Sequence, residues 1–431
     1  MVAFVVALSI IVAVHEYGHY IVGRWCGIHA EVFSLGFGPT LYSWIDRRGT
    51  VWQIAALPFG GYVKFLGDSD AASGKDSEAM ERMGPSGIER TMHGAKLWKR
   101  SATVAAGPIF NFILSIFVFA GMALWQGQTT EEVMIGELKP IPNPVAGQGL
   151  LPGDVIQSVD GTPTPDYPAF YDTIEAIDPP HALDYGVRRG EQDLTVTGPF
   201  AFPPMVDAVQ PQSAAMAAGL AVGDVILEVD GVPIFAFHEL RTAVAASDGR
   251  DLNLTVWRAG DTLDVTLAPK RTDLPAEDGG FETRWLIGVT GGLFFESETV
   301  AIGPFQSLQY GASATITVMT NSLSGLYHII TGAISSCNLQ GPIGIAEISG
   351  QAASQGTQSF IWLIAVLSTA VGLLNLFPIP VLDGGHLVFH AYEAASGRPP
   401  SDTALRVMMS AGLALILGFM VFALTNDLFC P

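Results

Sequence analysis

The sequence predicts a polytopic α-helical membrane protein that also carries two soluble repeat modules and a short membrane-associated β-hairpin region. Three observations support this fold class: long apolar spans, an internal repeat between two of them, and a segment of alternating polarity after the first. The chain has 431 residues, of which 49% are hydrophobic, and its mean hydropathy is +0.37. Its 48 glycines, 27 prolines and 62 charged residues (41 acidic, 21 basic) leave enough polar sequence for domains outside a bilayer.

Hydropathy indicates four membrane spans. An apolar stretch of about 20 residues can cross a bilayer as a helix. Four such stretches occur: Val2–Val22, Ser101–Trp125, Phe360–Leu376 and Leu405–Leu424. The third continues beyond Leu376 into a segment in which the helix is expected to be broken. We therefore expect transmembrane helices over residues 1–24, 101–125, 360–390 and 405–425.

The first span contains an H-E-x-x-H motif formed by His15, Glu16 and His19. Helix positions i and i+4 share one face about 5–6 Å apart, so both imidazoles can reach one Zn²⁺. Ionisable residues at mid-bilayer cost about 3 kcal/mol each on insertion scales, and a shared metal explains three of them better than chance does. Glu16 falls beside the metal, where its carboxylate can take a proton from the attacking water and pass it to the leaving amine.

The loop over residues 25–100 is expected to hold a membrane-associated β-hairpin. Between Glu31 and Gly67, alternating side chains bracketed by Gly49 and Pro58 indicate strands joined by glycine turns. An unpaired strand edge near lipid must be covered by protein or by a bound strand. Such an edge could hold an unwound substrate as an added strand; the alternative is a hairpin that only packs on the helices.

An internal repeat lies between the second and third spans. The run Gly149–Gly161 recurs seventy positions later as Gly219–Gly231, with G-D-V-I and V-D-G at matching positions. Each copy predicts a turn, a buried strand and a tight turn, and resembles a circularly permuted bacterial PDZ domain. The two tandem domains are expected over residues 132–200 and 202–270, with peptide binding or mere spacing as alternatives. Residues 300–336 follow as an amphipathic helix on the outer membrane surface.

A second motif supplies the best candidate for a third ligand, because a catalytic zinc site usually has three protein ligands. Asp383 is the only acid in the third span, and nearby prolines and glycines weaken the helix around it. Broken backbone at membrane depth is tolerated where it lines a cavity or is buried in protein; the alternative is a kinked packing helix with a lone Asp. The run is Asn375-Leu376-Phe377-Pro378-Ile379-Pro380-Val381-Leu382-Asp383-Gly384-Gly385-His386.

The pairing of H-E-x-x-H with a later N-x-x-P-x-P-x-x-D-G resembles the site-2 protease family of intramembrane zinc metalloproteases. The resemblance implies that His15, His19 and Asp383 bind zinc, that Glu16 is the catalytic acid and base, and that Asn375 contacts the substrate backbone. It covers essentially the whole chain, although only fourteen residues precede the first histidine. Further segments in the family's order are Phe33–Pro39, Pro58–Lys64, Gly107–Asn111 and Gly341–Ala346.

The resemblance implies a Zn²⁺ endopeptidase of the cell inner membrane. Its expected substrates are single-pass transmembrane proteins, such as an anti-sigma factor already trimmed on its outer side in envelope stress signalling. Two alternatives stay open: clearance of remnant signal peptides by the same chemistry, and a catalytically silent PDZ scaffold. We expect a monomer in contact with the lipid bilayer and no nucleic-acid partner. Most of the net charge of −20 lies in the outer region, and a solvated acidic surface is the preferred explanation for it.

Basic residues in the short loops indicate the orientation. Arg47, Arg48 and Lys96 lie between the first and second spans, and Arg398 and Arg406 lie between the third and fourth. Basic loops face the cytoplasm, so both termini and the repeat modules are expected in the periplasm.

The cysteines and the amino terminus indicate little more. Cys26, Cys337 and Cys430 form no C-x-x-C motif, so neither a thiolate zinc site nor a redox pair is indicated. Cys337 and Cys430 could both face an oxidising compartment, but the sequence does not decide whether they pair. No cleavable signal peptide is expected, because the first apolar segment holds the motif and lacks a basic start.

Overall fold

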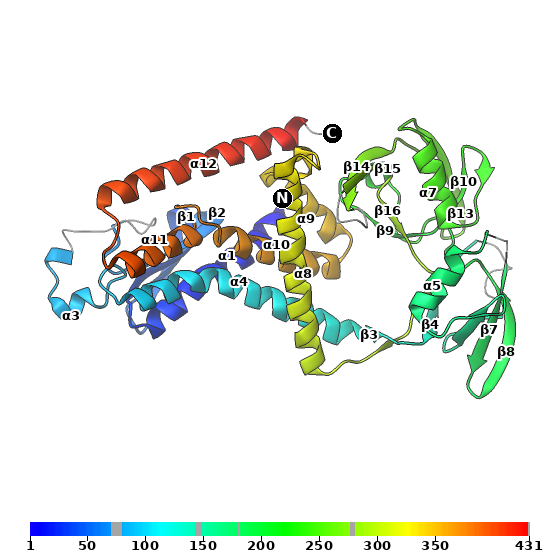
Figure 1. Cartoon of the computed structure of the whole chain (residues 1–431), viewed down its shortest axis with the longest axis horizontal. Helices are drawn as coiled ribbons and strands as arrows, with labels where there is room; N and C mark the ends of the chain where they lie inside the picture. The colour runs from blue at the N-terminus through cyan, green and yellow to red at the C-terminus, as the bar shows by residue number, and fades with distance from the viewer. Residues whose placement is uncertain (70–79, 143–148, 180–181, 276–280, 430–431) are drawn as a thin grey trace. The chain divides into compact units, whose positions relative to one another are not determined.

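The structure is a computed structural model that describes residues 1–69, 80–142, 149–179, 182–275 and 281–429. The chain divides into two compact units. The first, Met1–Met122 with Pro304–Pro431, is helical apart from one β-hairpin, and the second, Ala123–Gly303, contains the other sheets (Figure 1).

Among the described residues, four helices are long and apolar enough to cross a membrane, in agreement with the four predicted spans. They are α1 (Val2–Trp25), α4 (Leu97–Gln126), α10 (Thr357–Asn375) and α12 (Asp402–Phe429). The other helices of this unit are α3 (Pro85–Ile88), α8 (Pro304–Thr331), α9 (Pro342–Ser354) and α11 (Asp383–Ser396), with the 3₁₀ turn η1 (Ser336–Asn338).

Helices α1, α4 and α10 pack closely through small and polar residues. A Cβ added to Gly18 of α1 would lie 2.6 Å from the Ala106 carbonyl oxygen of α4. Ser115 of α4 donates its hydroxyl to the Ala365 carbonyl of α10 at 2.8 Å. Such contacts are what holds helices together in lipid, where apolar side chains gain little by leaving the solvent.

The predicted third span is two helices. α10 ends at Asn375, and α11 begins at Asp383 after a seven-residue break. The helix pattern stops at the prolines, which lack the N–H that a continuing helix needs. Gly384 and Gly385 allow the start of α11 to press against the break, because an added Cβ on either would clash with backbone carbonyl oxygens there.

The β-hairpin is a folded ribbon with one edge beside α1. Its strands are β1 (Ala30–Ile45) and β2 (Val51–Phe65), and each bends back on itself. Residues 32–35 of β1 pair with both 51–54 and 61–64 of β2, while 42–45 pair with 51–54 from the other side. In this pairing, residues 61–65 form one edge of the ribbon. Gly61 on that edge lies against α1, where an added Cβ would be 3.0 Å from Val12.

Asp46 fastens the ribbon to α1. Its carboxylate accepts the Tyr20 hydroxyl of α1 at 3.1 Å and the Trp52 indole N–H at 3.3 Å. Partial burial opposes ionisation, but hydrogen bonds from the backbone N–H groups of Thr50 and Arg48 and from these side chains hold the pKa of Asp46 at about 2. The carboxylate is therefore charged throughout the neutral range.

The second unit contains the two repeat copies. The first copy comprises β4 (Val133–Leu138), β5 (Val155–Val159), β6 (Thr162–Pro163), α5 (Tyr167–Glu175), β7 (Leu183–Arg189) and β8 (Gln192–Gly198). The second comprises β9 (Val206–Val209), α6 (Ala214–Ala217), β10 (Val225–Val229), β11 (Val232–Pro233), α7 (Phe237–Ala246), β12 (Leu252–Arg258) and β13 (Asp261–Leu267). The V-D-G turns form as predicted, with φ of 46° at Asp160 and 52° at Asp230.

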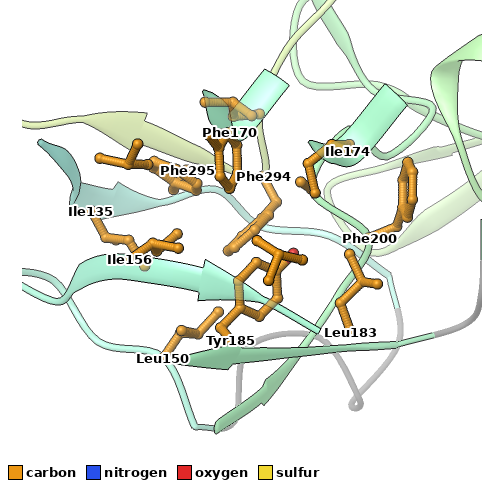
Figure 2. Close-up of a cluster of buried hydrophobic side chains, with 14 of the residues drawn as sticks. Ile135, Leu150, Ile156, Phe170, Ile174, Leu183, Tyr185, Phe200, Phe294 and Phe295 are labelled. Atoms are coloured by element: carbon orange, nitrogen blue, oxygen red, sulfur yellow. The ribbon is translucent and has the colours of Figure 1, made fainter. Parts of the chain in front are cut away.

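The second copy is nested inside the first. The predicted domain ranges, which end at residues 200 and 270, therefore omit the last strand of each copy. Strand β16 (Val289–Gly291) completes the second copy by pairing with β9. Strand β17 (Phe295–Ser297) pairs with β4 of the first copy. Phe294 and Phe295 are buried in that copy's core against Phe170 of α5, as Figure 2 shows. The sequence did not reveal this because three-residue strands carry no periodic signal.

Four further strands lie in this unit. β14 (Lys270–Pro275) pairs with β15 (Phe281–Leu286). β3 (Gln128–Thr129) pairs with β18 (Thr299–Val300), which brings the two ends of the nested modules together.

Equivalent ion pairs hold both copies. Arg189 donates twice to Asp154 at 2.7 Å, and Arg258 donates twice to Asp224 at 2.6 Å. Both carboxylates are fully buried, so each depends on its arginine.

We expect Arg258→Leu to destabilise the second copy by about 3 kcal/mol or more, because a buried carboxylate then lacks its counter-ion. Arg250→Leu is the matched control: it breaks the Asp230 pair, in which the arginine side chain is 61% exposed, and should cost less than about 1 kcal/mol. Denaturant midpoints from pulse proteolysis of the full chain measure both. Equal losses would contradict the buried role.

The carboxyl end of α12 is fixed to α9 and η1. The Asp427 carboxylate accepts the backbone N–H groups of Gly341 at 2.7 Å and Ile343 at 3.0 Å, at the start of α9. Cys337 in η1 is disulfide-bonded, whereas Cys26 is free and buried. Cys430 lies outside the described residues.

Candidate metal centre

The structure brings His15, His19 and Asp383 together from α1 and α11. The two histidine Nε2 atoms lie 3.2 Å apart. Asp383 Oδ2 lies 3.2 Å from His15 Nε2 and 3.5 Å from His19 Nε2. Three potential ligand atoms thus form a nearly equilateral triangle.

The triangle fits a tetrahedral zinc ion. Ligands at about 2.0–2.1 Å from tetrahedral zinc lie about 3.3–3.4 Å from each other. Asp383 Oδ2 is buried, and the described residues offer it no hydrogen-bond donor apart from the ring nitrogens of His15 and His19. An unpaired buried carboxylate oxygen is costly, and a cation at the triangle removes that cost. Three protein ligands leave a fourth position for water or substrate.

Helix α4 contacts Nδ1 of both histidines, the ring nitrogen that is not part of the triangle. His19 Nδ1 lies 2.9 Å from the Thr103 carbonyl oxygen, and His15 Nδ1 lies 3.2 Å from the Asn111 amide. Hydrogen bonds of this kind fix which nitrogen of a histidine faces a metal. The sequence reasoning gave neither residue a role; an amide inside an apolar span was the available signal.

Gly107 makes room for the histidines between these two positions. An added Cβ would clash with His19 Nε2 and would lie 2.8 Å from His15 Cε1. The glycine therefore allows α4 to lie directly behind the candidate ligands.

We expect Gly107→Ala to lower zinc affinity by about tenfold or more, the range seen when the surroundings of metal ligands are disturbed. Gly121→Ala in the same helix is the control, because an added Cβ there meets no atom within 4 Å. Zinc content after dialysis against a graded chelator series measures the effect. Indistinguishable curves for the two variants would refute the steric role.

Glu16 lies beside the triangle and is not one of the ligand atoms in it. Its carboxylate accepts the backbone N–H of Val63 on the ribbon edge. Gly61 on the same edge also lies near Glu16, because a Cβ added to this glycine would be 3.2 Å from Glu16 Cγ. The predicted acid and base thus adjoins both the candidate metal ligands and an edge strand.

Asn375 is the last residue of α10 and is half-buried, just before the break. Its side-chain amide donates to the Val371 carbonyl at 3.0 Å. It is not part of the ligand triangle. Asn375 therefore lies outside the cluster that contains Asp383, and its predicted contact with the substrate backbone stays a prediction.

Two contacts hold α11, and with it Asp383, against α4. Arg100 pairs with Glu393 at 2.6 Å. His390 Nδ1 lies 3.2 Å from the Ser101 hydroxyl. Because Glu393 and His390 lie further along the helix that begins with Asp383, these contacts fix the helix that carries the carboxylate.

Comparison with known proteins covers the whole chain. The sequence matches the model of peptidase family M50 over residues 3–419. A protein of Agrobacterium fabrum whose name describes a zinc metalloprotease is 37% identical over 432 residues, which cover 99% of this chain and 95% of the relative. The regulator of sigma-E protease RseP of Salmonella typhimurium is 33% identical over 458 residues, which cover 99% and 98%. The similarity includes both the helices and the nested modules.

Proposed function

Because this chain belongs to peptidase family M50, the site-2 protease family, and is an integral membrane zinc metalloprotease, we propose that it hydrolyses peptide bonds within transmembrane segments of other membrane proteins. The observation that carries this proposal is the triangle of His15, His19 and Asp383 on helices packed among apolar spans. The alternative of a catalytically silent scaffold is disfavoured, because the family is one of metalloproteases.

The positions of the residues support the following roles. His15, His19 and Asp383 would hold the zinc, which would provide a Lewis acid for the scissile carbonyl and the attacking water. Glu16 takes the proton of the attacking water and delivers it to the leaving amine. Its hydrogen bond from Val63 orients the carboxylate without occupying both oxygens.

The ribbon edge at residues 61–65 is the proposed binding strand for the substrate. A helical substrate protects its peptide bonds with internal hydrogen bonds, so it must unwind before hydrolysis. Pairing with an edge strand satisfies the freed backbone groups. This edge is the one that adjoins Glu16, which supports the proposal over mere packing. Asn375 would assist by bonding the extended backbone.

We expect a photo-crosslinker at Lys64, on the edge beside Glu16, to capture a bound transmembrane substrate. The same group at Tyr42, on the other edge of the ribbon, should not. Cross-linking in an inactive Glu16→Gln background, read by gel shift, checks this. Equal capture at both edges would favour a ribbon that only packs.

The proposed natural substrate is a single-pass protein already trimmed on its outer side, such as an anti-sigma factor. This proposal rests on the likeness to RseP, which is named as the regulator of sigma-E protease. Remnant signal peptides are the alternative substrate. Cleavage of both classes in detergent, with and without chelator, distinguishes them; no chelator-sensitive cleavage of either would refute the proposed function.

The proposed location is the inner membrane, as a monomer, with the modules and both termini in the periplasm. Basic loops between the spans support this orientation. The disulfide-bonded Cys337 and the free Cys26 are in keeping with it, because disulfides persist in oxidising compartments.

The nested modules, proposed to be PDZ domains, would act as a gate that rejects substrates with large outer domains. Because β3 and β18 pair, residues 131–297 can be replaced by an Asn-Gly turn without separating the flanking chain ends. We expect this variant to keep zinc and to cleave full-length and trimmed substrates at similar rates. A retained preference for the trimmed substrate would indicate that the modules only act as spacers.

A further inference from the structure

Asn111 is placed to control the orientation of His15. It is fully buried in α4, one turn beyond Gly107, and its side-chain Nδ2 lies 3.2 Å from His15 Nδ1. In this orientation its other side-chain atom, Oδ1, is buried and has no hydrogen-bond partner among the described residues. Buried amide oxygens are rarely left unpaired in native proteins.

A metal on His15 Nε2 would provide a donor for the Asn111 oxygen. Neutral imidazole carries one proton, so a ring that ligates through Nε2 carries that proton on Nδ1 and donates it. An amide –NH₂ cannot accept this bond, but its oxygen can. The two ends of an amide have nearly the same shape, so a half-turn of the amide plane places Oδ1 where Nδ2 now lies. The His15 proton and the Asn111 oxygen then satisfy each other.

We propose that Asn111 is a positioning residue of the metal centre, whose side-chain carbonyl accepts the Nδ1 proton of His15. This inference rests on the proposed zinc site and deepens it. The Thr103 carbonyl has the same role for His19 at 2.9 Å. Thr103, Gly107 and Asn111 therefore form a stripe on α4, spaced four residues apart, and both histidines lie along it.

The backbone around Asn111 is held in place independently of its side chain. Ser115 and Ser368 donate their hydroxyls to the Asn111 backbone carbonyl at 3.0 and 2.9 Å. Ser368 belongs to α10, so these bonds fix α4 against α10. The amide plane can turn while the backbone remains fixed.

The test compares variants that differ in acceptor capacity. Asn111→Leu has similar volume but no acceptor, whereas Asn111→Asp keeps an acceptor at the same place. Residues that hydrogen-bond to metal-bound histidines typically contribute about 10–100-fold to metal affinity. We therefore expect Asn111→Leu to lose zinc to excess chelator about 10–100-fold faster than the unaltered protein, and Asn111→Asp to retain it. Ser115→Ala, which removes the hydroxyl bonds to the Asn111 and Ala365 backbone carbonyls but leaves the Asn111 side chain unchanged, is the control and should retain zinc.

The measurement uses the full chain in detergent, with zinc release followed by a colorimetric chelator. The visible spectrum of the Co²⁺-loaded protein reports the ligand geometry independently of activity. Slow release from Asn111→Leu, or equal loss from the Leu and Asp variants, would overturn the proposal. If Asn111→Leu fails to fold, Asn111→Ala makes the same comparison.

Two reference samples separate this inference from the proposed function. The unaltered protein must hold zinc, and His15→Ala must lose it. If both results are obtained while Asn111→Leu releases zinc slowly, the positioning role alone is refuted. If the unaltered protein holds no zinc, the proposed centre itself is refuted.

Discussion

Glu16→Gln is expected to leave zinc bound while lowering turnover by about 10²–10⁴-fold, the range that general acid and base catalysis contributes. Glutamine has nearly the same shape, and its carbonyl can still accept the Val63 N–H that orients the side chain. It cannot take a proton from the attacking water. Because Glu16 is not one of the three clustered ligand atoms, the metal should remain.

The histidine variants are the contrast for this experiment. His15→Ala and His19→Ala each remove one corner of a triangle whose edges are 3.2 to 3.5 Å, so both should lose zinc together with activity. Metal analysis and cleavage of a single-pass substrate are measured on the same purified samples. Stoichiometric zinc in both histidine variants would refute the ligand assignment, and an active Glu16→Gln enzyme would show that another residue is the base.

Much of the site could be predicted from the sequence because its signals are local. His15 and His19 share a helix face because of the helix repeat alone. Asp383 lies hundreds of residues away, but a lone charge in an apolar span is costly, and this marks it as a candidate ligand. Hydropathy alone located α1, α4, α10 and α12, since a helix that crosses lipid must be long and apolar.

The remaining features depend on contacts between distant segments. Gly107 and Asn111 matter only because α4 packs behind α1, and the sequence of α4 does not indicate which helix it packs against. The nested order of the modules depends on the three-residue strands β16 and β17, whose pairing is set by tertiary packing. The ribbon edge beside Glu16 likewise arises because the two strands bend back on themselves. The sequence predicted strands there but not which edge lies beside Glu16.

Asp383 and Asn375 provide the second decisive experiment, because one motif carries both and the structure separates them. Asp383 begins α11 and points an otherwise unpaired oxygen at the two histidines. Asn375 ends α10 and bonds its own helix, outside the ligand triangle. A buried carboxylate near a cation is stabilised by it, whereas an amide is a poor zinc ligand and a good partner for an extended backbone.

We therefore expect the two substitutions to have different effects. Asp383→Asn keeps the shape of the side chain but loses its charge, so zinc occupancy and activity should fall together. Asn375→Ala should retain zinc and lose mainly cleavage, through poorer positioning of the substrate, with a larger effect on kcat than on zinc affinity. Metal content and cleavage rate, measured on both purified variants, test the assignment. Full zinc in Asp383→Asn would show that the third ligand lies elsewhere, and equal zinc loss in both would show that Asn375 supports the metal rather than the substrate.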